Sequence, residues 1–118
     1  MNSIVAGIVL LSVLLHSNPA FATSYTVGDG SGWKFNVAGW ENGKKFKAGD
    51  TLVFKYAPGT HNVVVVDKAS YDACTVPGNA KTFTSGNDVV TLGKGPNYFI
   101  CGFAQHCGFG MKIAANAA

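Results

Sequence analysis

Turn-forming residues recur at short intervals along this chain, and no segment has a convincing long helical period. Clusters of glycine, proline, asparagine and aspartate follow one another at 28–32, 41–43, 49–50, 58–59, 77–79, 85–87 and 93–96. The runs between the clusters are short and rich in valine, phenylalanine, tyrosine and threonine, which favour strands. Many short strands joined by frequent turns are typical of β-sandwiches and barrels. We therefore predict an all-β fold.

Five runs are the best strand candidates, at 51–56, 61–67, 88–92, 97–101 and 111–114, with weaker ones at 24–27 and 81–84. The run 63–66 is apolar on both faces, which predicts a strand buried in the middle of a sheet. The segment 67–74 has few strand formers, and we expect it to hold a helical turn. The expected fold is thus a β-sandwich or barrel with one or two short helical turns.

The first 22 residues have the features of a secretory signal peptide. Residues 4–15 are apolar, and Pro19 and an Ala-x-Ala pattern ending at Ala22 follow them. A membrane anchor or a core helix is the alternative, but the run is shorter than the roughly 20 residues that span a bilayer. We predict cleavage after Ala22, secretion, and one mature domain at 23–118. Residues 114–118 lack the spacer and apolar tail of a lipid-anchor signal, so no membrane anchor is expected.

The chain has a formal net charge of +3, and every one of its nine cationic residues is a lysine. A basic surface can attract nucleic acid, anionic lipid or acidic polysaccharide. The lysines are scattered, however, and only Lys44, Lys45 and Lys47 lie close together. A solvated surface is the simpler interpretation, and nucleic acid is not expected as a partner. An acidic extracellular polysaccharide is the one partner class retained, and we expect a monomer.

Removal of the leader leaves few residues that can bind a metal. The segment 23–118 contains two histidines, His61 and His106, and one methionine, Met111. It also contains three cysteines, Cys74, Cys101 and Cys107. Three cysteines in a secreted chain leave one thiol without a disulfide partner. That thiol needs another use.

The spacing within 101–111 indicates that use. His106 follows Cys101 by five residues, and Met111 follows His106 by five residues. Such a loop can curl so that all three side chains point at one ion, with His61 arriving from a separate strand. Two imidazoles and one thiolate in a plane, with a long axial thioether, form a blue-copper electron-transfer site. The sequence therefore predicts one type 1 copper ion held by His61, Cys101, His106 and Met111.

The same argument separates the cysteines. Neighbouring side chains in an extended segment point apart, so Cys107 does not converge with His106. Assigning Cys101 to copper leaves Cys74 and Cys107 to form a disulfide, which would stabilise the fold by about 3–4 kcal/mol. Backbone N–H groups near the Cys101 sulfur are expected to tune the thiolate, with Asn62 the best-placed candidate.

Other interpretations of these residues explain less. The histidines could be structural, Met111 could be a core residue and Cys101 could be a free thiol. In that case their spacing as metal ligands would be accidental. Structural zinc sites rarely use methionine. A Cys–His nucleophilic enzyme would need an orienting residue and a cleft, and it leaves Met111 without a role. A phosphate-binding loop at 28–32 lacks the strand–loop–helix context. No catalytic residue is assigned, and the protein is not expected to be an enzyme.

Several stretches of the chain also match a known family. These are Gly39-Trp40, the run 43–50, Leu52-Val53-Phe54, His61-Asn62-Val63, the run 98–101, His106-Cys107 and the run 110–113. Over nearly all of 23–118 the chain resembles the plant phytocyanins, and most closely their plantacyanin or basic blue protein subgroup.

This resemblance implies a cupredoxin Greek-key sandwich located in the apoplast or cell wall. It carries the copper roles onto the same four ligands and pairs Cys74 with Cys107. Methionine at 111 separates the chain from stellacyanin-like relatives, which have glutamine there. Ala104, where relatives often have proline, followed by Gln105, implies a less rigid ligand loop, which affects the redox potential and the partner surface.

The resemblance leaves two functions open. One is single-electron transfer through Cu(II)/Cu(I), with a redox partner that no motif identifies. The other is extracellular signalling or binding to an acidic cell-wall polysaccharide, with copper redox secondary.

Overall fold

The computed structural model describes residues 22–118, and the predicted leader 1–22 lies almost entirely outside them. Seven short strands dominate the described chain: β1 (Ser24–Thr26), β2 (Thr51–Lys55), β3 (Val63–Val66), β4 (Thr82–Phe83), β5 (Asn87–Thr91), β6 (Gly95–Ile100) and β7 (Lys112–Ala117). Three short helices accompany them: η2 (Asp29–Ser31), α2 (Lys68–Ala73) and η3 (Cys107–Phe109). Within residues 22–118, no helix has the length and apolar character needed to cross a membrane.

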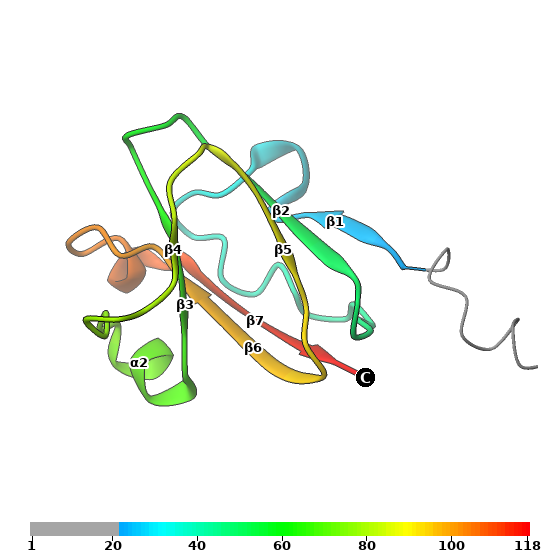
Figure 1. Cartoon of the computed structure of the whole chain (residues 1–118). Coiled ribbons are helices and arrows are strands. Elements are labelled where there is room, and N and C mark those ends of the chain that lie inside the picture. The colour runs from blue at the N-terminus through cyan, green and yellow to red at the C-terminus, as the bar shows by residue number, and fades with distance from the viewer. Residues whose placement is uncertain (1–21) are drawn as a thin grey trace, which may run out of the picture.

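The strands form two sheets (Figure 1). One has the order β1-β2-β5, with β1 parallel to β2, and the other has the order β4-β3-β6-β7. The chain crosses from one sheet to the other between β2 and β3, β4 and β5, and β5 and β6. The predicted all-β sandwich with short helical turns is confirmed. The central strand expected at 63–66 is β3, which pairs with both β4 and β6.

Adjacent valines of β3 belong to two different hydrophobic clusters. Val63 is fully buried among the residues between the sheets, which include Trp33, Phe54 and Phe99. Val64 points the other way and packs with Ile100 and Cys107 in a smaller cluster. Successive strand residues face opposite sides of a sheet, which is why an apolar run without alternation needs burial on both.

The segment after β3 folds as predicted into a short helix, α2. Asp67 caps its first turn, with a carboxylate oxygen that accepts a hydrogen bond of 2.8 Å from the Ser70 N–H. That backbone hydrogen bond lowers the pKa of Asp67 below its usual value. The helix ends at Cys74, whose φ of 55° is left-handed.

The last predicted strand differs most from the structure. We placed the last strand at 111–114, but β7 runs to Ala117 and pairs with β6 back to Gly95. Alanine is a weak strand former, so the composition after residue 114 did not indicate a longer strand. Burial explains the extension, because Ala115 and Ala117 are 0% and 3% exposed and small enough to fit beneath the neighbouring sheet.

Most carboxylates of the described chain are used internally. Asp50 and Asp88 are buried and accept hydrogen bonds from N–H and O–H groups of nearby turns. Glu41 accepts from the N–H groups of Gly39 and Ala114. Asp72 forms an ion pair with Lys68. Asp50, Asp88 and Glu41 thus fix turns and strand ends in place.

Candidate metal centre

Three side chains from distant parts of the sequence converge at one end of the sandwich. One ligand atom from each of His61, Cys101 and His106 lies within 4.8 Å of the other two. The two imidazole Nδ1 atoms are 3.1 Å apart, and the Cys101 sulfur is 3.5 Å from the Nδ1 of His106. Cys101 is 1% exposed, whereas both histidines are half-buried.

The fold positions these residues at the ends of strands. His61 follows a tight turn, in which the Thr60 N–H donates to the Ala57 carbonyl at 3.1 Å, and precedes β3. Cys101 follows β6, and His106 stands immediately before η3. The loop 101–107 lies at one end of β6 and β7, and the C-terminus lies at the other (Figure 1).

The segment 101–111 is closed by its own backbone. The Cys101 N–H donates to the Met111 carbonyl at 3.0 Å, and the Met111 N–H donates to the His106 carbonyl at 3.2 Å. Gln105 has a φ of 71°, which turns the chain so that His106 faces back toward Cys101. The structure places Met111 at 0% exposure in the same core as Cys101. All four residues predicted as ligands therefore lie at this end of the core.

Asn62 is tied to the same loop, but through its side chain. Its Oδ1 accepts a hydrogen bond of 2.6 Å from the Gly102 N–H, directly after Cys101. Its carbonyl accepts one of 2.9 Å from the indole N–H of Trp33. Asn62 thus holds the loop against the buried Trp33, and its predicted contact with the sulfur stays a prediction.

Replacing Asn62 with alanine is expected to lower the free energy of unfolding by about 1–3 kcal/mol, because the Gly102 N–H loses its acceptor. The loop next to Cys101 should loosen, which shifts the visible band of the copper-loaded protein. Denaturant unfolding and absorption spectra measure the two effects. Asn87→Ala, at an exposed position of β5, is the matched control and should change stability by less than about 0.5 kcal/mol. An equally small change in the Asn62 variant would contradict the role assigned to this hydrogen bond.

The electrostatics of the cluster favour uncharged imidazole. Burial lowers the pKa of His61, and the adjacent His106 lowers it further. Nearby, Tyr56 packs its ring 6.2 Å from that of His61, and its hydroxyl donates to the buried Asp88. Burial, followed by the hydrogen bond to Asp88, raises the pKa of Tyr56 to about 12. A neutral imidazole is the form that binds a metal.

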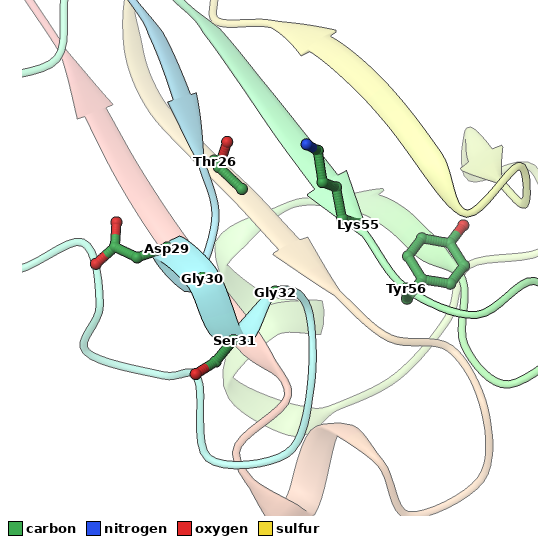
Figure 2. Close-up of a pocket in the computed structure, with 7 residues that line it drawn as sticks. All are labelled: Thr26, Asp29, Gly30, Ser31, Gly32, Lys55 and Tyr56. Carbon is green, nitrogen blue, oxygen red and sulfur yellow. The ribbon is translucent and has the colours of Figure 1, made fainter.

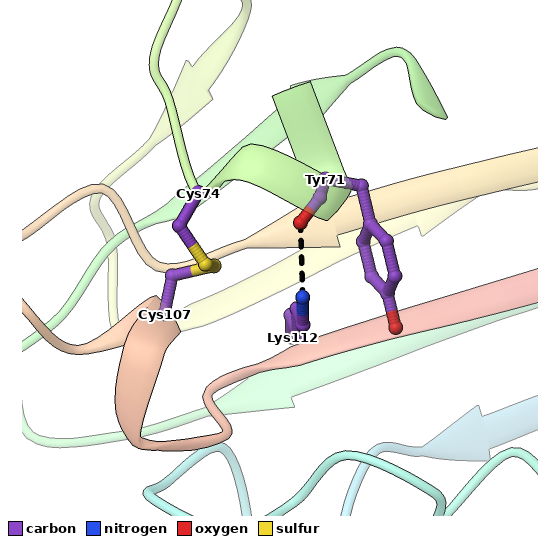
Figure 3. Close-up of a disulfide and its surroundings, with 4 residues drawn as sticks. All are labelled: Tyr71, Cys74, Cys107 and Lys112. Carbon is purple, nitrogen blue, oxygen red and sulfur yellow. Dashed lines mark hydrogen bonds between the residues drawn. A yellow bond between two sulfur atoms is a disulfide. The ribbon is translucent and has the colours of Figure 1, made fainter. Parts of the chain in front are cut away.

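A disulfide joins Cys74 and Cys107, as predicted (Figure 3). The two Cα atoms are 5.6 Å apart, and the bridge connects the end of α2 to the residue after His106. Beside it, the Lys112 ammonium donates to the Tyr71 carbonyl at 3.0 Å. The disulfide leaves Cys101 as the one free thiol among the described residues.

Exposed aromatic rings surround His106. The ring of Phe35 lies 4.7 Å from the imidazole and that of Phe103 lies 5.5 Å from it, with Phe109 packed 6.1 Å from Phe35. These three rings, which we call the aromatic collar, are 37–61% exposed. Phe103 and Phe109 can be found from the sequence, because both lie within the ligand-bearing segment 101–111. Nothing in the sequence indicates Phe35, because it comes from a distant turn.

Residues 29–32 of the glycine-rich turn line a hollow of about 540 Å³, together with Thr26, Lys55 and Tyr56 (Figure 2). None of the four predicted ligands lines this hollow. It adjoins the metal centre only through Tyr56, whose ring packs near that of His61.

The donor set fits copper. Imidazole and thiolate are ligands that suit both oxidation states of copper, and a two-histidine, one-cysteine set is typical of blue-copper sites. Burial of Cys101 under the core and partial exposure of the histidines place the sulfur in an apolar environment with one open side.

Comparisons with known proteins agree with this interpretation. A family model described as a plastocyanin-like domain matches residues 33–111. The chain is 48% identical over 117 residues to "Chemocyanin" of Lilium longiflorum, with 99% of this chain and 93% of that protein covered. It is 50% identical over 116 residues to "Basic blue protein" of Arabidopsis thaliana, with 98% and 90% covered.

Solved structures give the same result. Cucumber basic protein, a blue copper protein, matches with a TM-score of 0.80 and 51% identity, over 81% of this chain and 100% of its own. Spinach plantacyanin matches with a TM-score of 0.69 and 56% identity, over 74% and 94%. The fold and centre are those of a blue copper protein. The chain belongs to the phytocyanin family of cupredoxins, and copper is its cofactor.

Proposed function

We propose that this protein is a secreted carrier of single electrons, whose copper ion is held by His61, Cys101, His106 and Met111. The observation that carries the proposal is the convergence of two imidazoles and one thiolate within 4.8 Å, beside a buried methionine. Copper supplies a one-electron Cu(II)/Cu(I) couple at such a site. The cupredoxin family consists of electron carriers and generally not of enzymes, which supports a carrier rather than a catalyst.

The four ligands have different roles in this proposal. The Cys101 thiolate is the soft donor, buried where water does not compete. His61 and His106 are the nitrogen donors, and both keep partial exposure. Met111, fully buried at the end of the loop, is the axial thioether in this proposal. The backbone hydrogen bonds between Cys101, His106 and Met111 fix these side chains relative to one another.

His106 is the proposed exit for the electron. Its imidazole is half-buried and is surrounded by the aromatic collar of Phe35, Phe103 and Phe109. Exposed apolar rings at a rim are typical of a contact surface and let a partner approach the imidazole closely. The exposed residues Pro58 and Gly59 lie before His61 and extend the proposed apolar mouth.

The visible and electron-spin-resonance spectra with one equivalent of Cu(II) test the proposal. We expect an intense visible band and the narrow hyperfine splitting of a type 1 centre, followed by full bleaching with one electron per protein and recovery on reoxidation. A colourless, tetragonal copper signal would overturn both the ligand set and the carrier function.

Met111→Gln is expected to keep copper bound but to lower the redox potential, because an amide oxygen stabilises Cu(II) more than a thioether does. Voltammetry measures the change. Ile113→Val is the matched control, since Ile113 is equally buried in the same core but has no ligand atom. Equal potentials for Met111→Gln and the unaltered protein would remove Met111 from the ligand set.

A further inference from the structure

The first residues of the described chain are fixed by one buried carboxylate. Asp50 is 2% exposed. Its Oδ1 accepts a hydrogen bond of 2.8 Å from the Thr23 nitrogen, and its Oδ2 accepts one of 2.9 Å from the Lys47 N–H. The Thr23 carbonyl accepts from the Thr51 N–H at 2.9 Å, and β1 then runs parallel to β2. The Thr23 nitrogen therefore occupies a defined position against Asp50.

The Asp50 carboxylate has no cationic partner within residues 22–118. A buried carboxylate is costly unless it is paired with a cation or well hydrogen-bonded. Both of its donors here are neutral backbone N–H groups. The one ion pair between residues 22 and 118 is Lys68–Asp72, and the Lys47 side chain is exposed. A cation at the Thr23 nitrogen would complete the site.

We propose that processing after Ala22 places this cation: the new α-ammonium of Thr23 pairs with the Asp50 carboxylate and fastens β1 to the sheet. In this step, an endopeptidase that prefers small residues hydrolyses the Ala22–Thr23 bond. Water adds across the bond, the carboxylate leaves on Ala22, and the Thr23 amine takes up a proton. The inference rests on the secretion part of the proposed function and is independent of copper.

The lengths of relatives agree with a processed segment of this size. The whole chain of cucumber basic protein matches 81% of this chain, and residues 23–118 make up the same share. "Basic blue protein" of Cucumis sativus likewise matches over 97% of its own length and only 79% of this chain. The relatives from lily and Arabidopsis match 98–99% of this chain. The matched cucumber protein thus has about the length of residues 23–118, whereas the lily and Arabidopsis relatives match almost the whole chain.

The α-ammonium of Thr23 should stabilise the folded protein. Hydrogen bonds between charged groups are roughly twice as strong as neutral ones, and burial limits screening by salt. We expect the ratio of folded to unfolded protein to rise about tenfold when Thr23 carries the free ammonium, which corresponds to about 1.4 kcal/mol.

The first experiment expresses the full chain in a secreting eukaryotic host and determines the N-terminus of the secreted, copper-loaded protein. We expect it to begin at Thr23. A product that begins at another residue overturns the proposal. This result is read from mass and sequence alone, so it does not depend on the copper spectrum.

The second experiment moves the charge by one residue. An alanine inserted between Ala22 and Thr23 gives a product in which the Thr23 nitrogen is again an amide, and its denaturant midpoint should show the tenfold loss. Thr23→Ala, which keeps an ammonium at the same position, is the matched control and should be unchanged. If processing trims the added residue, selective acetylation of the α-amine makes the same comparison. Equal stability of the charged and uncharged forms overturns the ion pair.

Asp50→Asn separates this ion pair from a general effect of the extra residue. The difference between the inserted and uninserted proteins should vanish in the Asn background. A difference that persists overturns the role of Asp50. If the Asn variants do not fold, the comparison of insertion with Thr23→Ala still decides the question. If the inserted and uninserted proteins differ in stability but show no blue spectrum, the copper function is contradicted and the ion pair is not.

Discussion

A protein with Cys101 replaced by serine is expected to lose its intense visible absorption entirely. The thiolate is the ligand that gives a blue-copper site its character, and a serine hydroxyl remains protonated at neutral pH. The loss of copper affinity should exceed the 10- to 100-fold that follows removal of a group that only supports a ligand. Serine is close in size to cysteine, so the fold should persist. Absorption and circular dichroism spectra of the copper-treated variant measure the two properties.

The paired variant Cys74→Ala/Cys107→Ala provides the control for this result. It removes two sulfur atoms but keeps Cys101, so a folded sample should remain blue. Colour retained by Cys101→Ser, or lost by a folded double variant, would mean that the wrong cysteine has been assigned to copper.

The same double variant is expected to show the second large effect, a loss of about 3–4 kcal/mol in the free energy of unfolding. The bridge spans a sequence separation of 33 residues, and the loop-entropy model gives this magnitude for a loop of that length. Guanidinium titration of the metal-free proteins measures it. Reduction of the unaltered protein by a thiol reductant should reproduce the loss.

A loss below about 1 kcal/mol would show that the bridge contributes little to global stability. Its effect would then be confined to the ligand loop, where Cys107 follows His106 directly. A shifted visible band in the double variant, with near-normal stability, would identify that local role.

The sequence allowed the metal centre to be predicted because its information is local and scarce. Three of the four expected ligands lie within 101–111, and the segment 23–118 contains no other histidine or methionine. The disulfide followed from the same scarcity, since one thiol was assigned to the metal. The apolar run at 63–66 likewise predicted a central strand, because only burial on both faces tolerates it.

The features that could not be predicted depend on contacts between distant segments. Nothing near Phe35 indicates that its ring reaches His106, 71 positions later. The strand β7 extends over weak strand formers because β6 offers it a partner and the core offers space only for alanine. The bond from Gly102 to the Asn62 side chain joins residues 40 positions apart. Such contacts leave no periodic pattern in a single sequence.

The internal hydrogen bonds of the carboxylates also affect the electrostatic potential around the molecule. Because Glu41, Asp50 and Asp88 hold turns and strand ends together, they form no ion pairs with lysines of residues 22–118. The surface therefore presents its excess positive charge with little local compensation, and this potential extends about one Debye length, roughly 8 Å, at physiological salt. Encounters with anionic surfaces should be accelerated at low ionic strength and slowed by added salt. The residues that stabilise the turns thus also determine which approaching molecules are attracted.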